Sequence, residues 1–271
     1  MKRILITLTI IMFSASFIIA GEIQLRPMIG YGFGIHQKEM GTDKEIDTSG
    51  KTTKNENIYY SGGAGLNFGL GVLIGLTENL GVELGGGYVL GSEKDIDKET
   101  DNSTSPVTTD VLKNKSSYIP IDITLKVKGN SGQITPYVGF GPTIAVGGKT
   151  IKTYSGKGVV TYEAEYETTY NIGFGWNAVL GADYKISDSM SLSLSLFLHT
   201  VGLKPSKKKV TKYTINGTDM MNTLTTRDKE TEYKEDDSSD DPTDLNAPKI
   251  ERTEVIPFSS LDIKLGVAIG F

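Results

Sequence analysis

The sequence predicts an all-β protein, an eight-stranded antiparallel up-and-down transmembrane β-barrel with four long extracellular loops. Three observations lead to this prediction. An apolar leader opens the chain, later segments alternate apolar with small or polar residues, and short turns alternate with long polar connections. Barrel strands in an outer membrane alternate in this way because one face meets lipid and the other faces the interior.

Residues 1–20 are predicted to be a secretory signal peptide. Lys2 and Arg3 form a basic start, and an apolar run follows from Ile4. That run is shorter than the roughly 20 residues of a membrane-spanning helix, so an uncleaved anchor is the weaker alternative. Cleavage is expected after Ala20, with Ser16 as the alternative, and residues 21–271 then form one barrel domain.

The composition excludes several classes of protein. The chain has no Cys, so it has neither a disulfide framework nor a thiolate metal site. Its net charge of -5 argues against a nucleic-acid binder. Its 32 Gly residues fall mostly within the alternating segments, where they favour strands rather than disorder.

The first four strands are predicted over residues 23–33, 63–74, 80–88 and 119–127. The last of these shows the pattern most clearly. Its odd positions are Ile, Ile, Ile, Leu and Val, and its even positions are Pro, Asp, Thr and Lys. The odd positions are therefore expected to face lipid and the even positions the interior.

The other four strands are predicted over residues 134–146, 171–184, 190–199 and 260–271. Pro136 and Pro142 weaken the first of them, because proline removes a ladder hydrogen bond. The last strand ends at Phe271, in register with its outward apolar residues. A terminal aromatic in this position resembles the signal that the barrel assembly machinery recognises.

The connections alternate between short and long, as in outer-membrane barrels. Short turns lie near residues 75–79, 129–133 and 187–189. The long polar stretches, read as outward-facing loops, are residues 35–57, 92–116, 148–168 and 202–256. A soluble β-sandwich is the alternative, but it gives little reason to combine Gly and Ser on one face with unbroken Leu or Ile on the other.

Charged residues of both signs occupy predicted inward positions. They are Arg26, Glu83, Asp122, Lys126, Asp183, Lys185, Asp262 and Lys264. Because buried charges need partners, a structural network of ion pairs that plugs the interior is expected. A charged conduction path is the alternative, although eight strands enclose little more than their own side chains.

Aromatic residues at the strand ends predict contacts with the membrane interface. These anchors are Tyr31, Tyr88, Tyr170, Trp176 and Tyr184. Tyr137 is the exception, because its register points it inward, where its hydroxyl is expected to hydrogen-bond within the plug.

The mature chain resembles the small outer-membrane β-barrels of the OmpA/OmpX and opacity-protein type. The residues that carry the resemblance are the Gly-aromatic segments 29–34 and 135–141 and the terminal Gly270-Phe271. The resemblance covers residues 21–271 and implies an architecture and an outer-membrane location, not an activity. No peptidoglycan-binding domain follows the last strand, so a cell-wall tether is not implied.

Enzymatic activity is not predicted, and no cofactor is expected. The only histidines are His36 and His199. Lipid A deacylases on eight-stranded barrels resemble this layout but use a His-x-Ser pair, whereas His199 is followed by Thr200 and Val201. A histidine that faces a polar interior is better explained as a hydrogen-bonding residue.

The last long stretch is basic near its start and acidic over residues 228–244. Glu235 to Asp237 and the pair Asp240-Asp241 offer oxygen ligands for a hard cation such as Ca²⁺. The spacing lacks the pattern of a known calcium loop, so a solvated, partly disordered surface loop is the main expectation.

The predicted function is therefore a non-enzymatic structural or surface-interaction role exerted through the long loops. The expected partners are outer-membrane lipid, the assembly machinery through the C-terminal strand, and an unidentified ligand at the loops. No nucleic-acid partner is expected, and the protein is expected to be a monomer. The alternative is a narrow channel for small or apolar molecules, resembling the OmpW-like barrels.

Overall fold

The computed structural model describes residues 22–35, 37–130, 132–236 and 239–271. The predicted signal peptide, residues 1–20, and His36 lie outside the described residues. Among the residues that are described, no helix has both the length and the apolar character needed to cross a membrane.

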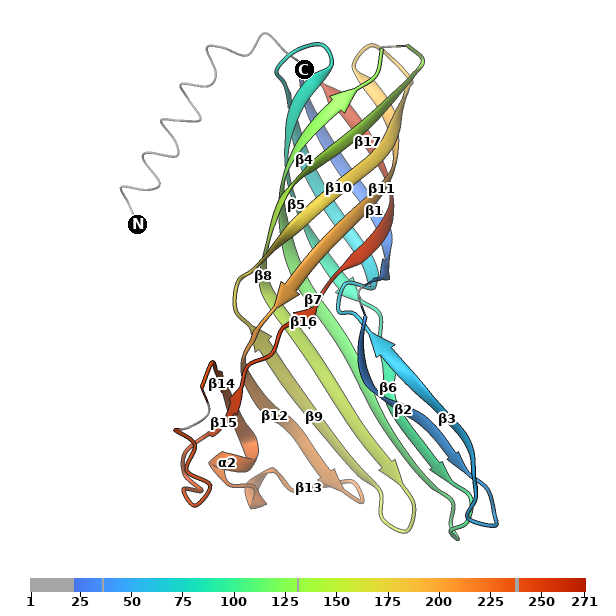
Figure 1. Ribbon diagram of the computed structural model, residues 1–271, viewed down its shortest axis with the longest axis vertical. Coiled ribbons are helices and arrows are strands. Elements are labelled where there is room, and N and C mark those ends of the chain that lie inside the picture. The colour runs from blue at the N-terminus through green and yellow to red at the C-terminus, as the bar shows by residue number, and fades with distance from the viewer. Residues whose placement is uncertain (1–21, 36, 131, 237–238) are drawn as a thin grey trace.

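Eight strands form a closed antiparallel ring (Figure 1). In chain order they are β1 (Ile23–Gly34), β4 (Gly65–Gly75), β5 (Leu80–Gly91), β7 (Thr108–Lys128), β8 (Ile134–Lys157), β10 (Gly173–Lys185), β11 (Met190–Leu203) and β17 (Ser260–Gly270). Each strand pairs with its neighbour in this order, and β17 pairs with β1 to close the ring. Each of the eight predicted segments overlaps one of these strands, and only residues 63–64, 171–172 and 271 of the predicted segments lie outside them.

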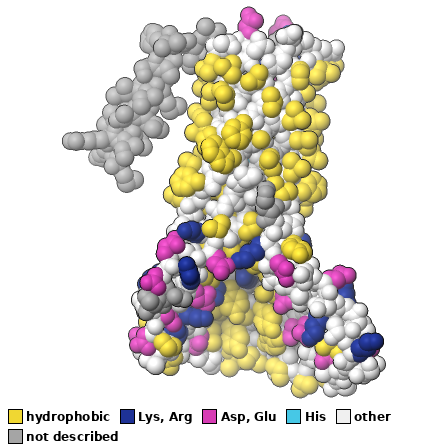
Figure 2. Space-filling view, viewed as in Figure 1, with side chains coloured by type: hydrophobic (Ala, Val, Ile, Leu, Met, Phe, Trp, Pro, Cys, Tyr) yellow, Lys and Arg dark blue, Asp and Glu magenta, His cyan; other side chains and the backbone are white. Residues whose placement is uncertain are grey.

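The outer face of the ring is apolar over most of its height, as Figure 2 shows. On β7 the exposed side chains are Ile119, Ile121, Ile123, Leu125 and Val127. The segment from Ile119 to Val127 has nine residues, which is within the range of about 9–11 residues that a tilted strand needs to cross a bilayer. Trp176 stacks on Phe140 in the same band, with ring centroids 5.3 Å apart.

The chain contains more strands than the sequence predicted. The sheet has 17 strands in total, so the prediction of an all-β chain is confirmed while eight is too few. Most of the additional strands lie beyond the end of the ring that carries the long connections (Figure 1). The stretches predicted as polar loops are therefore largely β-structure.

We call this outer part the extension. It consists of β2 (Lys38–Ile46), β3 (Thr52–Tyr60), β6 (Lys94–Asp101), β9 (Tyr162–Tyr170), β12 (Pro205–Ile215), β14 (Glu230–Lys234), β15 (Lys249–Arg252) and the outer ends of β7 and β8. Short elements join them: β13 (Thr218–Asp219), η1 (Met221–Thr223), α2 (Thr226–Lys229) and β16 (Ile256–Pro257). Ladders link the strands in the order β3, β2, β6, β7, β8, β9, β12, β14, β15.

The extension escaped prediction because charged pairs replace the apolar alternation. Lys44 lies opposite Glu99 across the β2–β6 ladder, with an Nζ to Oε1 distance of 2.7 Å. Lys212 on β12 and Glu163 on β9 form a similar pair at 2.7 Å. When both faces of a strand carry polar side chains, the period of two disappears from the hydrophobicity pattern although the backbone still pairs.

The extension does not close as the ring does. Among the described residues, β3 pairs only with β2 and β15 only with β14, so the two outermost strands leave one side open. Figure 1 shows them on separate arms. An ion pair between Lys38 and Glu254, 2.6 Å from Nζ to Oε2, connects the two arms near the ring.

The closed ring predicts heat-modifiable mobility on an SDS gel. We expect the unboiled protein to migrate faster than the boiled protein, because a ring without free edges resists unfolding by the detergent. A single band with the same mobility before and after boiling would contradict the ring.

Two ring glycines provide matched variants for this measurement: Gly181 faces the interior, whereas Gly86, between the exposed Leu84 and Tyr88, faces outward. A Cβ at Gly181 would lie 2.5 Å from Tyr137 Cζ, whereas the nearest contact of a Cβ at Gly86 would be 3.9 Å. We therefore expect Gly181→Ala to lower the fraction of the fast band clearly and Gly86→Ala to leave it within error. Equal effects of the two variants would show that the interior is not packed as described.

Candidate functional site

Arg26 is the centre of a buried ionic cluster near the end of the ring that carries the short turns. Its two terminal nitrogens contact the two carboxylate oxygens of Asp183, each at 2.8 Å. Its Nη2 also donates to Ser193 Oγ at 2.8 Å, and its Nε lies 3.2 Å from Glu83 Oε2. Because a guanidinium binds a carboxylate through two parallel bonds, Asp183 fixes the orientation of this side chain.

Lys126 completes the cluster from β7. Its ammonium contacts the same Glu83 oxygen that faces Arg26. The Tyr137 ring packs against both cations, 5.2 Å from Arg26 Cζ and 4.6 Å from Lys126 Nζ. We call Arg26, Glu83, Lys126, Tyr137, Asp183 and Ser193 the Arg26 network. Its two cations and two carboxylates balance, which is what a desolvated interior requires.

A second ionic cluster lies nearer the extension. Asp122 accepts from Thr143 Oγ1 at 2.5 Å, and its carboxylate faces His199 Nε2 at 3.1 Å. Asp262 accepts from Asn67 Nδ2 at 2.8 Å and lies 3.5 Å from Lys264 Nζ. We call Asp122, His199, Asp262, Lys264 and their amide and hydroxyl partners the Asp122 network.

His199 lies between the two carboxylates of this network. It is fully buried, with Nε2 facing Asp122 and Nδ1 3.4 Å from Asp262 Oδ2. A neutral imidazole donates from one nitrogen only, whereas an imidazolium donates from both. The protonated form therefore suits this position, and it would balance the charge of Asp122 and Asp262 together with Lys264.

The structure brings together seven of the eight charged residues that the sequence placed inward. Lys185 is the exception, and its predicted interior position is corrected. Its side chain is about half exposed and pairs with Asp188 at 2.8 Å at the rim of the ring. The strand β10 ends at this residue, so the alternation no longer decides which way the side chain points.

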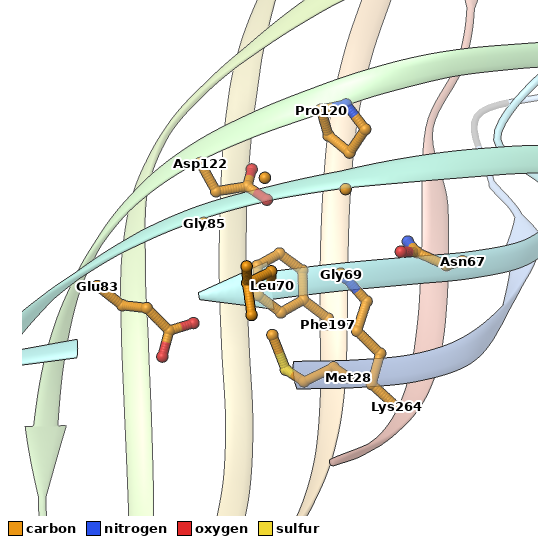
Figure 3. Close-up of a pocket in the computed structure, with 12 residues that line it drawn as sticks. Met28, Asn67, Gly69, Leu70, Glu83, Gly85, Pro120, Asp122, Phe197 and Lys264 are labelled. Carbon is orange, nitrogen blue, oxygen red and sulfur yellow. The ribbon is translucent and has the colours of Figure 1, made fainter. Parts of the chain in front are cut away.

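Glycines provide the volume that the long charged side chains occupy. A Cβ at Gly71 would lie 3.1 Å from the Glu83 carboxylate. Figure 3 shows the small void that remains between the two networks, lined by Glu83, Asp122 and Lys264 among others. Its volume is about 10 Å³, room for about one water molecule. A dissolved molecule has no free path at this level of the ring.

An apolar plug lies between the Asp122 network and the extension. It consists of Val89, Tyr118, Ala145, Val201, Leu203 and Phe258, all buried. Phe258 lies between β16 and β17 and packs edge-on against Tyr118, with ring centroids 5.4 Å apart. Its backbone N–H donates to Val201 O at 2.8 Å. The plug therefore closes the ring at the point where the extension begins.

A cavity of about 280 Å³ lies on the outer side of this plug. Its walls come from β2, β3, β7, β8, β9, β12, β14, β15 and β16. At its base a chain of hydroxyls runs from Tyr60 through Ser116 and Thr150 to Tyr170, with distances of 2.6, 2.7 and 2.9 Å. Burial raises the pKa of Tyr60 and of Tyr170 to about 12, so both phenols stay neutral near pH 7.

Tyr170 occupies a different place from the one predicted for it. Its ring packs against Phe258 at 5.0 Å and forms part of the cavity wall, so it is not an interface anchor. The other predicted anchors, Tyr31, Tyr88, Trp176 and Tyr184, are exposed on the outer face of the ring.

The acidic stretch at residues 228–244 is tied down by ion pairs. Arg227 contacts both carboxylate oxygens of Asp240, and the Ile250 N–H donates to Asp240 at 2.8 Å. Glu235 pairs with Lys204 at 2.6 Å. Among the described residues, no group of three or more His, Cys, Asp or Glu is placed to hold a metal ion.

The Arg227 guanidinium and the Ile250 N–H lower the pKa of Asp240 to about 2. Its carboxylate is therefore charged, and the contact fully formed, above the ordinary Asp pKa of about 4. The contact weakens only as the pH falls toward about 2.

Most of the cavity residues were missed because they lie in segments predicted as loops. The plug was missed for another reason: apart from Ala145, which was predicted to face inward, and Leu203, its residues lie just beyond the ends of the predicted strands and outside the predicted loops. A signal for them is present on β8. Gly147 has a φ of +63° at a bulge, where β8 carries one more residue than β7. The inward positions on β8 thereby change from odd residues such as Ala145 to even residues such as Thr150 and Lys152. A change of the inward positions from odd to even residues at a glycine indicates a strand that continues through a bulge.

The outer membrane protein beta-barrel domain family matches residues 5–222 of this chain. The chain belongs to this family. Membership agrees with the closed ring and its apolar outer face, and it points to the bacterial outer membrane.

Several solved structures are similar to this chain, and one of them is similar over almost its whole length. It is the outer membrane protein OprG from Pseudomonas aeruginosa, at 12% sequence identity, with 93% of this chain and 96% of that chain covered and a TM-score of 0.46. No curated protein sequence matches.

The Arg26 network predicts a large loss of stability when its central cation is removed. We expect Arg26→Met to lower the free energy of unfolding by about 3–5 kcal/mol, because Glu83 and Asp183 then share one buried cation. Lys185→Gln, at the exposed rim, should change it by less than about 0.5 kcal/mol. Urea titration in phospholipid vesicles, followed by the fluorescence of Trp176, measures both. Equal shifts would contradict the buried network.

The Arg227 contact predicts the behaviour of the acidic stretch. We expect Arg227→Ala to increase proteolytic cleavage within residues 228–249 several-fold, because the contact to Asp240 joins the two ends of the stretch. Lys204→Ala, which removes an exposed ion pair, should change the rate little. Calcium should not protect the wild type, since Arg227 already occupies the Asp240 oxygens. Calcium-dependent protection would show that these acids bind the ion.

Proposed function

We propose that this protein is a sealed, non-enzymatic outer-membrane β-barrel whose extension acts as a surface-interaction platform. The observation that carries the proposal is the filling of the interior by three successive layers. The Arg26 network, the Asp122 network and the apolar plug each span the ring, and the void between the first two has room for about one water molecule.

The architecture of the extension supports the platform. β7 and β8 run from the membrane-facing ring into the extension without interruption, and their ladder continues from Thr109 to Lys128. Hydrogen-bonded strands hold a binding surface in place with less loss of entropy than a flexible loop does. In Figure 2 charged side chains are spread over both arms of the extension, with hydrophobic side chains between the arms, and the charged arms suit contact with water and soluble partners.

A non-enzymatic role is supported by the position of His199. The side chain is fully buried between two carboxylates, and the apolar plug separates it from the extension. A general base must reach the proton that it abstracts, and no lipid or solute has that access here.

The remaining parts of the proposal follow from the sequence. Residues 1–20 serve as the export signal, and Phe271 with the strand β17 serves as the assembly signal. The Phe271 side chain is exposed, and its N–H donates to Ile23 O at 3.0 Å, next to the seam between β17 and β1. The protein is proposed to act as a monomer, because its ring closes within one chain.

A narrow channel is the second candidate function. It is favoured by the outer cavity, which borders the plug on the side of the extension, and the extension itself is open on one side. Phe258 would then have to move to connect the cavity with the interior. Both ionic networks, on the short-turn side of the plug, would also have to separate.

Single-channel recording in planar bilayers separates the two candidates. We expect no steady conductance from the wild type, because three layers block the ring. Phe258→Ala should remain closed as well, since the two ionic networks still fill the ring on the short-turn side of the plug. Reproducible conductance steps from the wild type would overturn the sealed barrel and favour the channel.

A further inference from the structure

The outer cavity has one strongly polar wall. Asn114 on β7 and Lys152 on β8 are partners across the ladder, so their side chains start close together on the same face. Both line the cavity. Asn114 is 2% exposed, and its Oδ1 is a buried acceptor without a hydrogen-bond partner in the described structure. A buried acceptor of this kind requires a donor.

Lys152 supplies a positive charge at the same wall. In the part of the chain that is described, no carboxylate lies within ion-pair distance of its ammonium. The two acids that line the cavity are already paired, Glu251 with Lys249 at 2.8 Å and Glu254 with Lys38 at 2.6 Å. Lys152 and Arg252 therefore have no direct ion pair among the described residues, and Glu251 and Glu254 act on them only at longer range.

Burial also lowers the pKa of Lys152, the nearby Lys208 and Lys38 act in the same direction, and Glu251 acts against them. The net effect of these surroundings disfavours the charged ammonium. A bound anion would stabilise this charge.

The other walls of the cavity are largely apolar or aromatic. They include Met40, Tyr60, Tyr170, Tyr233 and Ile256. A volume of about 280 Å³ lies just below the range of about 300–1,000 Å³ that is usual for ligand pockets. The site therefore suits a small ligand with a polar end and an apolar body.

We propose that this cavity binds a small amphipathic hydroxy acid. Its carboxylate contacts Lys152, its neighbouring hydroxyl donates to Asn114 Oδ1, and its apolar ring or chain lies against the tyrosines. The proposal deepens the surface-interaction role proposed above and rests on it for access from outside the cell.

Mandelate is a suitable probe, because it carries a carboxylate, an adjacent hydroxyl and a phenyl ring. Phenylacetate lacks the hydroxyl, and mandelamide replaces the carboxylate with a neutral amide. We expect mandelate to bind the folded full-length protein in detergent about tenfold more tightly than mandelamide and roughly fivefold more tightly than phenylacetate, as measured by titration calorimetry for each enantiomer.

Variants assign these differences to individual residues. Lys152→Gln should weaken mandelate binding about tenfold and make mandelate and mandelamide bind alike, because the charge that distinguishes them is gone. Asn114→Ala should remove the difference between mandelate and phenylacetate. Lys149→Gln is the matched control, since Lys149 lies three residues away on β8, does not line the cavity and pairs with Glu167 at 2.6 Å. It should leave every affinity unchanged.

Three results would overturn the site: no binding of mandelate at millimolar concentration, equal binding of mandelate and mandelamide to the wild type, or the same loss with Lys149→Gln as with Lys152→Gln. The bilayer recording tests the sealed barrel separately. Conductance steps combined with Lys152-dependent binding would remove the sealed barrel and leave the site. A silent bilayer without such binding would remove the site alone.

Discussion

The pairing of β17 with β1 is the constraint on which the rest of the structure depends. This pairing joins the first and last strands of the ring, so every ring strand has two neighbours. In a hydrocarbon environment an unpaired backbone group costs several kcal/mol, and only a closed ladder avoids that cost. Once the ring is closed, its apolar side chains can face outward and its polar side chains must fill the interior.

Closure fixes the volume of the interior, and the charged residues then set its contents. Eight strands enclose a space about as wide as their own side chains. Arg26 and Lys126 fit because Gly71 and Gly181 leave room for Glu83 and the Tyr137 ring. Each of the two networks pairs its carboxylates with cations or with His199. Salt bridges of this kind contribute little net stability compared with an apolar core, but removing one partner leaves a charge that is costly to bury.

The extension obeys a different rule, because water reaches both faces of most of its strands. Its strands need no apolar face, and exposed ion pairs such as Lys44 with Glu99 add little to the backbone ladder. Its outermost strands need no partner either, since water satisfies their free backbone groups. The extension can therefore stay open on one side and enclose a cavity next to the plug.

The sequence by itself determined the ring. Period-two alternation located all eight ring strands, and the inward positions of Arg26, Glu83, Asp122, Lys126, Asp183, Asp262 and Lys264 followed from the same pattern, because lipid on one side allows only one register. The tertiary structure alone decided which charges pair, since partners such as Arg26 and Asp183 lie 157 residues apart. It also decided the plug and the cavity. Phe258 lies in irregular backbone, and Asn114 and Lys152 lie on the outer side of the bulge between β7 and β8, so the alternation of the ring segments does not extend to them.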